Sequence, residues 1–512
     1  MLRRLKPYKA VTPEETINKI RSLFFELGLP FREEDISQYF YFDAYKLSLL
    51  NPVNNKPVFT TFGKGRTREW ALASAWGEMV ERVQNLAFYT ICLYPSEPEI
   101  DNNHSENYKY YPDEKKLPKE VLNPLLKDLF PANNHTVISV PFAGLLNGKI
   151  EHIPFRNLQV IVGSNGMCSG NTKEEALVQG ISEIFERHVL KEFYLRPFCP
   201  PNIALELFSD FDIFHTIQKL IKTEGYKITV KDCSLRKNYP VIGVLVENKS
   251  NEYTFHLGAD PNPVTAFERC FTEMFQGGEI QFKNKTELVQ HKHFNLDEDF
   301  WKRSFTYSIS SYSGHWPVKL FNDTPDYSFN GFNHPESISD QDDLDYLLEI
   351  LRNENKELFI RDNSFLGHPT YHIYIPGMSE MTNVPNNLFA DIFREFDNYL
   401  PYLTNLYSCP KDQREDMLKI IKRYTTMSPA REFRTGDYFA FFHEHPNSQL
   451  SSDVLIELLA LNDQDEYTKQ LRKLNSPSCF ICQKCNLTKD CNYPFLTEVW
   501  RKLRLRMEAF YE

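Results

Sequence analysis

The chain has 512 residues, with 58 lysines and arginines against 69 aspartates and glutamates, so its formal net charge is −11. This acidic balance argues against broad nucleic-acid binding, which needs a basic surface. A hydrophobic content of 41% excludes an intrinsically disordered chain. No apolar stretch is long enough to span a bilayer, and no apolar core follows the basic N-terminal residues as it does in a signal peptide. We therefore expect a cytoplasmic protein with reduced cysteines and no membrane contact.

Helical and strand patterns alternate along most of the chain, which indicates an α/β (α+β) fold. The segments 54–62 and 239–247 are predicted strands, and the second is apolar enough to be buried. Polar and turn-forming residues predict surface excursions at 97–134 and 281–336. Strand patterns fade beyond about 400, which predicts a domain boundary near 385–400. Apolar residues at helical spacing predict helices at about 13–27, 67–90, 173–195, 263–277, 338–353 and 386–399.

A repeated segment combines a helix start with glutamates. Residues 65–82 and 170–187 match at Gly, Thr, Ala, Leu, two Glu and Arg with constant spacing, and residues 262–276 keep part of the pattern. Thr172 stands three residues before a Glu, as in a capping box. Asn262 is followed by a proline, as at a capped helix start. All three copies are therefore predicted to be N-terminal ends of helices.

The glutamates of the second copy lie on one stripe of a largely apolar helix, and two interpretations are open. In one, they form structural ion pairs with arginines of the repeat or face solvent, as most helical charges do. In the other, carboxylates from three helices converge, and because they repel one another they bind Mg²⁺, while arginines and a lysine hold phosphate. The second is favoured because the pattern recurs on three helices. Glycine-rich turns at 63–65 and 164–171 support this interpretation, because such turns present backbone amides to anions at helix starts. Taken alone, they would be better explained as ordinary strand-to-helix connections.

These segments resemble the YcaO family of ATP-dependent enzymes that activate backbone amides. The resemblance covers about residues 5–390 and is strongest to the family's stand-alone type, described as an accessory factor in ribosomal-protein methylthiolation. It implies a YcaO-type nucleotide-binding fold with mixed sheets in a catalytic domain at 1–390. Beyond that domain, the sequence pattern predicts a mainly helical region at 391–475 and a cysteine-bearing tail at 476–512. The matching stretches are Lys9 to Thr16, GKGRTREWALASAWGEMVER, SNGMCSGNTKEEALVQGISEIFER, TAFERCFTEMFQGG and LFIRDNSFLGHPTYHIYIPGMSEM.

The resemblance also implies roles for individual residues, although it assigns no catalytic side chain. Cys168 stands where the stand-alone type has a serine, and because a thiol is a poorer hydrogen-bond donor, Ser169 is an alternative contact. The Mg²⁺ ligands would be Glu78, Glu81, Glu175, Glu183, Glu186 and Glu273. The ATP contacts would be Lys9, Thr16, Arg82, Cys168, Asn171, Gln179, Arg187 and Arg269.

In the implied reaction, ATP phosphorylates a peptide amide oxygen, and a nucleophile then attacks the amide carbon to give an azoline, a thioamide or an amidine. Such a reaction depends on positioning and charge neutralisation. Two alternatives remain: an ATP-binding accessory factor for methylthiolation with no catalysis of its own, and a maturation enzyme for a small peptide natural product. The expected partners are a peptide or protein substrate, a methylthiotransferase or sulfur-delivery protein, and a second copy in a homodimer.

The C-terminal tail holds a cluster of cysteines. Closely spaced cysteines typically bind zinc or an iron–sulfur cluster, and zinc is the first expectation here. A set of ordinary thiols is the alternative. The chain lacks the proline-rich tail typical of azoline-forming family members, which disfavours an azoline product. The clustered residues are Cys479, Cys482, Cys485 and Cys491.

Overall fold

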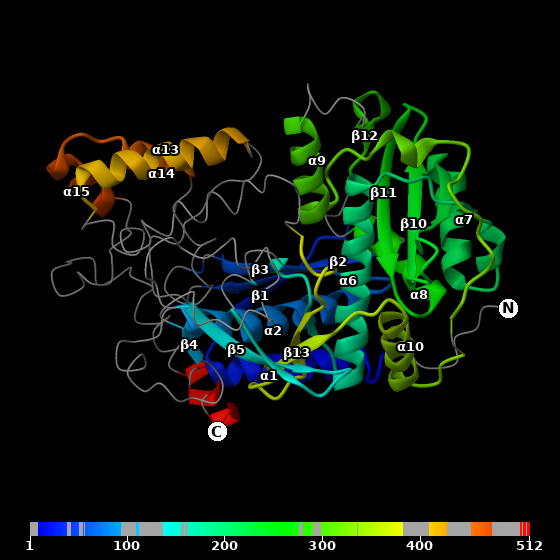
Figure 1. Ribbon diagram of the computed structural model, residues 1–512, viewed down its shortest axis with the longest axis horizontal. Helices are drawn as coiled ribbons and strands as arrows, with labels where there is room; N and C mark the ends of the chain where they lie inside the picture. The colour runs from blue at the N-terminus through cyan, green and yellow to red at the C-terminus, as the bar shows by residue number, and fades with distance from the viewer. Residues whose placement is uncertain are drawn as a thin grey trace.

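The computed structural model describes most of the chain up to residue 381 and shorter parts beyond it. Its helices and strands form three sheets flanked by helices (Figure 1), and every pairing between these strands is antiparallel. The predicted α/β (α+β) class is confirmed. No helix among the described residues is both long and apolar enough to cross a membrane. The described ranges are 9–37, 42–50, 55, 57–93, 109–111, 137–154, 158, 162–275, 280–289, 298–334, 336–381, 409–427, 452–473, 502–503, 505–507 and 509–511.

The first sheet has the order β1 (Phe31–Asp35), β2 (Asp43–Leu50) and β3 (Pro57–Gly65). Helix α2 (Arg68–Leu93) packs against β2 and β3, and α1 (Pro13–Leu27) packs against α2. The capping box of Thr12 and Glu15 begins α1, and Gly28 in the left-handed conformation ends it. The buried Trp76 of α2 meets the ring of Phe24 from α1 edge-on at 5.3 Å. These contacts join the N-terminal helix to the first helix of the repeat.

The second sheet has the order β12 (Lys283–Asn284), β11 (Glu252–Ala259), β10 (Val241–Glu247), β9 (Lys227–Asp232) and β8 (Asn202–Ile203). Its central strand β10 is buried along nearly its whole length, as predicted from its apolar sequence. Val244 and Val246 face a core formed with α7 (Asp212–Glu224) and α8 (Pro263–Phe275). Val241 and Leu245 face the opposite core, which contains α6 (Lys173–Leu195). The sheet therefore separates two helical layers.

The third sheet has the order β4 (Lys109–Tyr111), β5 (Val137–Gly144), β13 (Phe359–Asp362), β14 (Thr370–Tyr374) and β7 (Met167–Ser169), and β6 (Ile150–Pro154) pairs with β5. Helix α6 packs against this sheet as well as the second, and α10 (Asp340–Asn353) packs against α6 (Figure 1). Helix α2 contacts β7 and β14. Most residues of α6 are buried, because the helix lies between two sheets.

The segment 281–336 is not the surface excursion that its polar composition predicted. It contains α9 (Glu298–Ser311) and short 3₁₀ turns at η3 (Lys285–Glu287) and η4 (Val318–Phe321); a further turn, η2 (Leu205–Phe208), lies earlier in the chain. Trp316 is fully buried, and Phe305 is buried in the same core as α6. Its aromatic residues fill the space beside α6, at irregular spacings that no helical or strand period describes.

Beyond residue 400 the described elements are helices, in agreement with the predicted helical character. They are α13 (Lys411–Met427), α14 (Ser452–Leu459) and α15 (Gln464–Lys473), which pack in sequence against one another. The predicted helix at 386–399 and the boundary near 385–400 lie outside the described residues, as does nearly all of 97–134. The division into domains at 1–390, 391–475 and 476–512 stays a prediction.

Candidate functional site

A cavity of about 650 Å³ lies where α2, α6 and α8 meet the N-terminal segment. Its walls carry side chains from all three copies of the sequence repeat. Cys168 is absent from its lining, whereas the neighbouring Ser169 lines it. The predicted site residues that line it are Lys9, Thr16, Glu78, Glu81, Arg82, Asn171, Glu175, Gln179, Glu183, Glu186, Arg187, Arg269 and Glu273.

The glycines of the repeat allow a strand end to approach the following helix closely. A Cβ atom on Gly65 would lie 2.6 Å from the backbone nitrogen of Ala71, and one on Gly170 would lie 2.6 Å from that of Ala176. Both distances are far shorter than a normal contact, so only glycine fits. The shared spacing in the sequence therefore reflects the same local packing at the starts of α2 and α6.

The predicted helix caps form, with one difference. The Asn262 side chain accepts a hydrogen bond from the amide of Val264, and the Thr172 hydroxyl accepts one from the amide of Glu175. The Glu175 carboxylate does not complete a capping box. Instead it accepts hydrogen bonds from the Ala10 amide at 3.1 Å and from the side chain of Asn171. The first turn of α6 thus presents a carboxylate to the cavity.

The carboxylates of the cavity are paired with cations. Arg82 lies 3.1 Å from Glu81 and 3.5 Å from Glu78, and Arg187 lies 3.8 Å from Glu183. The ion pairs expected if the glutamates have a purely structural role are therefore present. The same side chains, however, also line the cavity.

Two further ion pairs cross between separate elements. Lys9 lies 3.3 Å from Glu175, so the N-terminal segment is joined to α6. Lys64 on β3 pairs with Glu273 on α8.

Burial makes two of these carboxyl groups unusually weak acids. Burial, opposed by Arg82 and reinforced by Glu183 and Glu78, raises the pKa of Glu81 to about 8. Burial and the nearby Glu273 raise the pKa of Glu186 to about 7. Negative charge at these positions is therefore undercompensated, and a bound cation would stabilise the ionised form.

Glu175 behaves differently, because its partners outweigh its burial. Burial alone would raise the pKa of Glu175, but the Lys9 ammonium and the Ala10 amide hold the pKa below its ordinary value. This carboxylate is already well compensated by the chain itself.

The polar side chains are linked in a chain of hydrogen bonds. The Thr16 hydroxyl donates to the Asn171 side-chain oxygen at 2.9 Å, and the Asn171 amide group donates to Glu175. Arg269 donates to the carbonyl oxygen of Ala259 at 3.0 Å and also to the side chain of Gln179. These contacts hold the Thr16, Asn171 and Arg269 side chains in place before any ligand binds.

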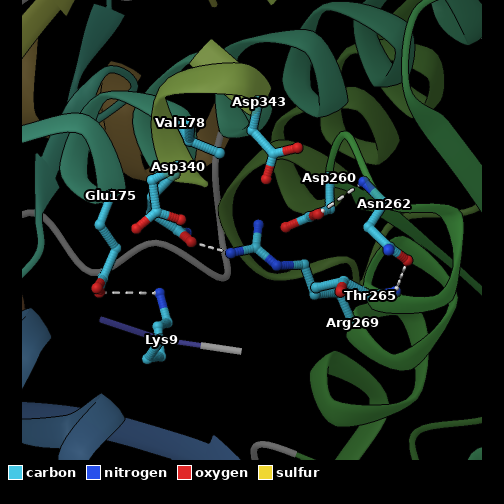
Figure 2. A pocket seen from close by; sticks show the side chains of 10 residues that line it. Lys9, Glu175, Val178, Asp260, Asn262, Thr265, Arg269, Asp340 and Asp343 are labelled. Carbon is cyan, nitrogen blue, oxygen red and sulfur yellow. Dashed lines mark hydrogen bonds and ion pairs between the residues drawn. The ribbon is translucent and has the colours of Figure 1, made fainter. Parts of the chain in front are cut away.

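A second, small cavity of about 30 Å³ adjoins the first and shares Lys9, Glu175, Gln179 and Arg269 with it. Figure 2 shows that Asp340 and Asp343 reach this space from α10, opposite Asp260 at the approach to α8. Sequence reasoning missed these aspartates, because nothing in the repeat refers to α10.

Sequence reasoning also missed several residues of the large cavity. Lys64 lies in the glycine-containing stretch that precedes the first copy of the repeat. Its place in that stretch was the one feature of the sequence that could have marked it as a site residue. Arg66 pairs with Glu268 at 3.1 Å, next to that stretch. Tyr312 and His368 come from segments far away in the sequence, and no local pattern marks them.

The Cys168 side chain does not line the cavity. The Cys168 thiol is fully buried, donates to the carbonyl oxygen of Tyr371, and has a pKa raised by burial. This geometry favours Ser169 over Cys168 as a contact for a ligand in the cavity. The metal-binding cluster predicted at Cys479, Cys482, Cys485 and Cys491 lies outside the described residues and stays a prediction.

Comparison with known proteins identifies the fold and the family. A family profile described as YcaO cyclodehydratase, ATP- and Mg²⁺-binding, matches residues 62–379, more than half of the chain. The chain belongs to the YcaO family. The resemblance seen in the repeat is therefore confirmed, and the matched region includes all three copies.

Two relatives are each 29% identical to this YcaO-family chain. One is the ribosomal protein S12 methylthiotransferase accessory factor YcaO of Escherichia coli, matched over 73% of this chain and 66% of its own length. The other is an uncharacterized protein of Haemophilus influenzae, matched over 68% of this chain and 64% of its own length. The chain thus spans slightly less than two thirds of the length of either relative.

Among solved structures, a heterocyclase in complex with substrate and cofactor superposes with a TM-score of 0.52. The sequence identity is 18%, and the match covers 74% of this chain and 54% of the heterocyclase. The predicted YcaO-type fold is confirmed by this similarity.

The cavity residues fit the ATP and Mg²⁺ of the family description. Carboxylate oxygens are the ligands that Mg²⁺ prefers. Burial raises the pKa of Glu81 to about 8 in spite of its ion pair with Arg82, so a further cation would stabilise the ionised carboxylate. Among the described residues, no group of three or more His, Cys, Asp or Glu side chains is arranged to hold a metal ion by itself.

Proposed function

We propose that this chain uses ATP and Mg²⁺ to phosphorylate a backbone amide of a peptide or protein and so activates it for attack by a nucleophile. The observation that carries the proposal is the convergence of carboxylates and cations from three helices on one cavity of about 650 Å³. Small-molecule sites typically have volumes of about 300–1,000 Å³. The cavity therefore has room for a nucleotide.

In the proposed site, Lys9, Arg187 and Arg269 bind phosphate oxygens, and Thr16, Asn171 and Gln179 make polar contacts with the nucleotide. Bound Mg²⁺ would neutralise charge that develops on the transferred phosphoryl group. The ligands that we assign to it are the glutamates of the cavity, Glu78, Glu81, Glu175, Glu183, Glu186 and Glu273.

The ion pairs of the cavity prepare it for a polyanion that arrives with a divalent cation. Arg82 compensates Glu78 and Glu81, and Arg187 compensates Glu183. A nucleotide offers the arginines new anionic partners, while its cation offers the carboxylates a new positive partner. The exchange leaves no buried charge without compensation, which is the costly outcome for a charged site.

The proposed chemistry needs no nucleophile from the chain. The amide oxygen takes the γ-phosphoryl group as ADP leaves, the external nucleophile bonds to the amide carbon, and the carbon–oxygen bond breaks with release of inorganic phosphate. The chain's contribution is to align these groups and to supply positive charge around the phosphoryl group.

A second candidate function rests on the Escherichia coli relative, whose name describes an accessory factor for methylthiolation of ribosomal protein S12. In that case the chain would bind ATP and a methylthiotransferase without modifying an amide itself. A thioamide- or azoline-forming role in peptide maturation is a third candidate.

The test combines mass spectrometry with a matched pair of variants on α6. The chain is incubated with ATP, Mg²⁺ and candidate substrates, including ribosomal protein S12, with and without sulfide. A loss of water or an exchange of oxygen for sulfur in the substrate supports the proposal. We expect Glu183→Gln to lower substrate-dependent ATP turnover at least about tenfold, as loss of a charge in a phosphoryl-transfer site does.

Glu192→Gln is the control, because Glu192 lies on the same helix and pairs with Arg196 away from the cavity. It should keep wild-type turnover. ATP binding without any turnover or substrate modification would instead favour the accessory-factor function.

A further inference from the structure

The hydroxyl of Tyr312 donates a hydrogen bond to Oε1 of Glu186 inside the large cavity. Both side chains are about 6% exposed. Tyr312 follows the last residue of α9, and Glu186 lies on α6, so the contact joins two helices. The family resemblance assigns no role to Tyr312.

The backbone holds Tyr312 in an unusual conformation. Its φ angle is 54°, in the left-handed region that a bulky residue rarely adopts. The chain ends α9 there: the Tyr312 amide donates to the carbonyl oxygen of Ser308, and the buried Lys283 ammonium donates to the Tyr312 carbonyl oxygen at 2.6 Å. A Cβ atom on Gly314 would lie 1.8 Å from the Ser304 carbonyl oxygen, so the chain turns back tightly against α9.

The aromatic ring of Tyr312 is fixed as firmly as its backbone. It stacks on the buried His256 ring, with centroids 4.8 Å apart and planes 20° apart, and it lies beside Trp316. The end of α9 is also attached to α6 through Arg187, which donates to the Ile309 carbonyl oxygen. The fixed ring therefore holds the Tyr312 hydroxyl next to Glu186. A glycine would end α9 with less backbone strain. The hydroxyl contact with Glu186 would explain why a tyrosine stands at this strained position.

We infer that Tyr312 is a positioning residue that holds the Glu186 carboxylate in the orientation needed to bind Mg²⁺ with the nucleotide. This inference rests on the proposed function. With one Glu186 oxygen accepting from Tyr312, the other oxygen would remain available to a metal ion, and the carboxylate would need less ordering when the ion binds. Hydrogen bonds of this kind to metal-binding carboxylates typically change metal affinity about 10–100-fold.

The test measures binding, so that it does not depend on turnover. Binding of a non-hydrolysable ATP analogue is titrated by calorimetry at a series of Mg²⁺ concentrations for wild type and Tyr312→Phe, which keeps the ring and loses the hydroxyl. We expect the Mg²⁺ concentration at half-maximal binding to rise about tenfold or more in the variant. Analogue affinity should recover when Mg²⁺ is saturating.

Tyr327→Phe is the matched control, because it removes a hydroxyl that donates to the Asp232 carbonyl oxygen at 2.7 Å, and Tyr327 does not line the large cavity. It should leave the Mg²⁺ midpoint unchanged. Adding Tyr312→Phe to Glu186→Gln should shift the midpoint no further, because the hydroxyl acts through that carboxylate.

The outcomes separate this inference from the function on which it rests. A wild-type midpoint in Tyr312→Phe overturns the role of Tyr312 alone. A wild-type chain that binds no Mg²⁺–nucleotide overturns the proposed function and the inference together. If Tyr312→Phe does not fold, Tyr312→Asn carries the same expectation, since asparagine tolerates the left-handed backbone.

Discussion

At the scale of single residues, Arg269 shows how a phosphate-binding side chain can be prepared in advance. One guanidinium nitrogen donates to the Ala259 carbonyl oxygen and another to Gln179. Two anchors of this kind limit the rotamers of a long side chain, so less conformational entropy is lost when the remaining donors meet a phosphate. A lysine keeps the charge but cannot hold both anchors and a phosphate in one plane.

We therefore predict that Arg269→Lys weakens nucleotide binding about 10–100-fold, which corresponds to loss of a charge-assisted hydrogen bond. Calorimetric titration with an ATP analogue at saturating Mg²⁺ measures the effect. Arg196→Lys is the control, because the Arg196 side chain is 80% exposed and pairs with Glu192. Equal affinity of Arg269→Lys and wild type would contradict the role assigned to Arg269.

At the scale of elements, the repeat contains glycines that allow close packing as well as glutamates and arginines that carry charge. Gly65 and Gly170 let the chain pass close to the first turn of α2 and of α6. Each helix can then begin at the cavity wall and direct its glutamates inward. On the third copy, Gly258 of β11 has a related role, since a Cβ there would lie 2.3 Å from the Ala266 carbonyl oxygen of α8.

Because Gly170 lies against a helix start and Gly77 has room for a Cβ atom, we predict opposite effects on stability for alanine at these two positions. Gly170→Ala should lower the free energy of unfolding by about 1–3 kcal/mol, because its Cβ would force the start of α6 away from the strand. Gly77→Ala should raise the free energy of unfolding by up to about 1 kcal/mol, since alanine favours a helix interior. Its Cβ would meet nothing closer than 3.9 Å. Urea unfolding measures both, and equal effects would contradict the packing explanation.

At the scale of the whole molecule, α2 and α6 connect the three sheets. Helix α2 contacts the first and third sheets, and α6 contacts the second and third. The cavity lies where these helices meet α8. Packing around these helices also buries histidines in the neutral state. Burial and, to a smaller extent, Arg82 lower the pKa of His372 to about 3. An unfolded chain would bind a proton at this histidine near pH 6.5, whereas the folded chain would not.

The pH dependence of stability follows from this difference. His372 contributes stability that is present above about pH 6.5 and is lost as the pH falls towards about 3. We predict that His372→Leu reduces the slope of unfolding free energy against pH in this window by about 1.4 kcal/mol per pH unit. Glu81 and Glu186 act in the opposite direction, so the wild-type slope alone is not diagnostic. An unchanged slope in the variant would show that His372 is protonated in the folded chain.

Local features of this fold are encoded in the sequence more clearly than non-local ones. The starts of α1, α6 and α8 were predictable because caps are encoded within one turn of a helix. The carboxylates and arginines of the cavity were predictable because the repeat places them on one face of each helix. The segment 281–336 was not, because its polar composition hides aromatic residues that fill the core beside α6.

By itself, the sequence determined where α1, α2, α6, α8 and α10 form and which charges they carry, since these depend on neighbours within a few residues. It did not predict α7 or α9. Only the tertiary structure decided which charges meet. Lys64 reaches Glu273 across 209 positions, and Tyr312 reaches Glu186 across 126. Contacts at such separations depend on how sheets and helices pack, and no local periodicity encodes them.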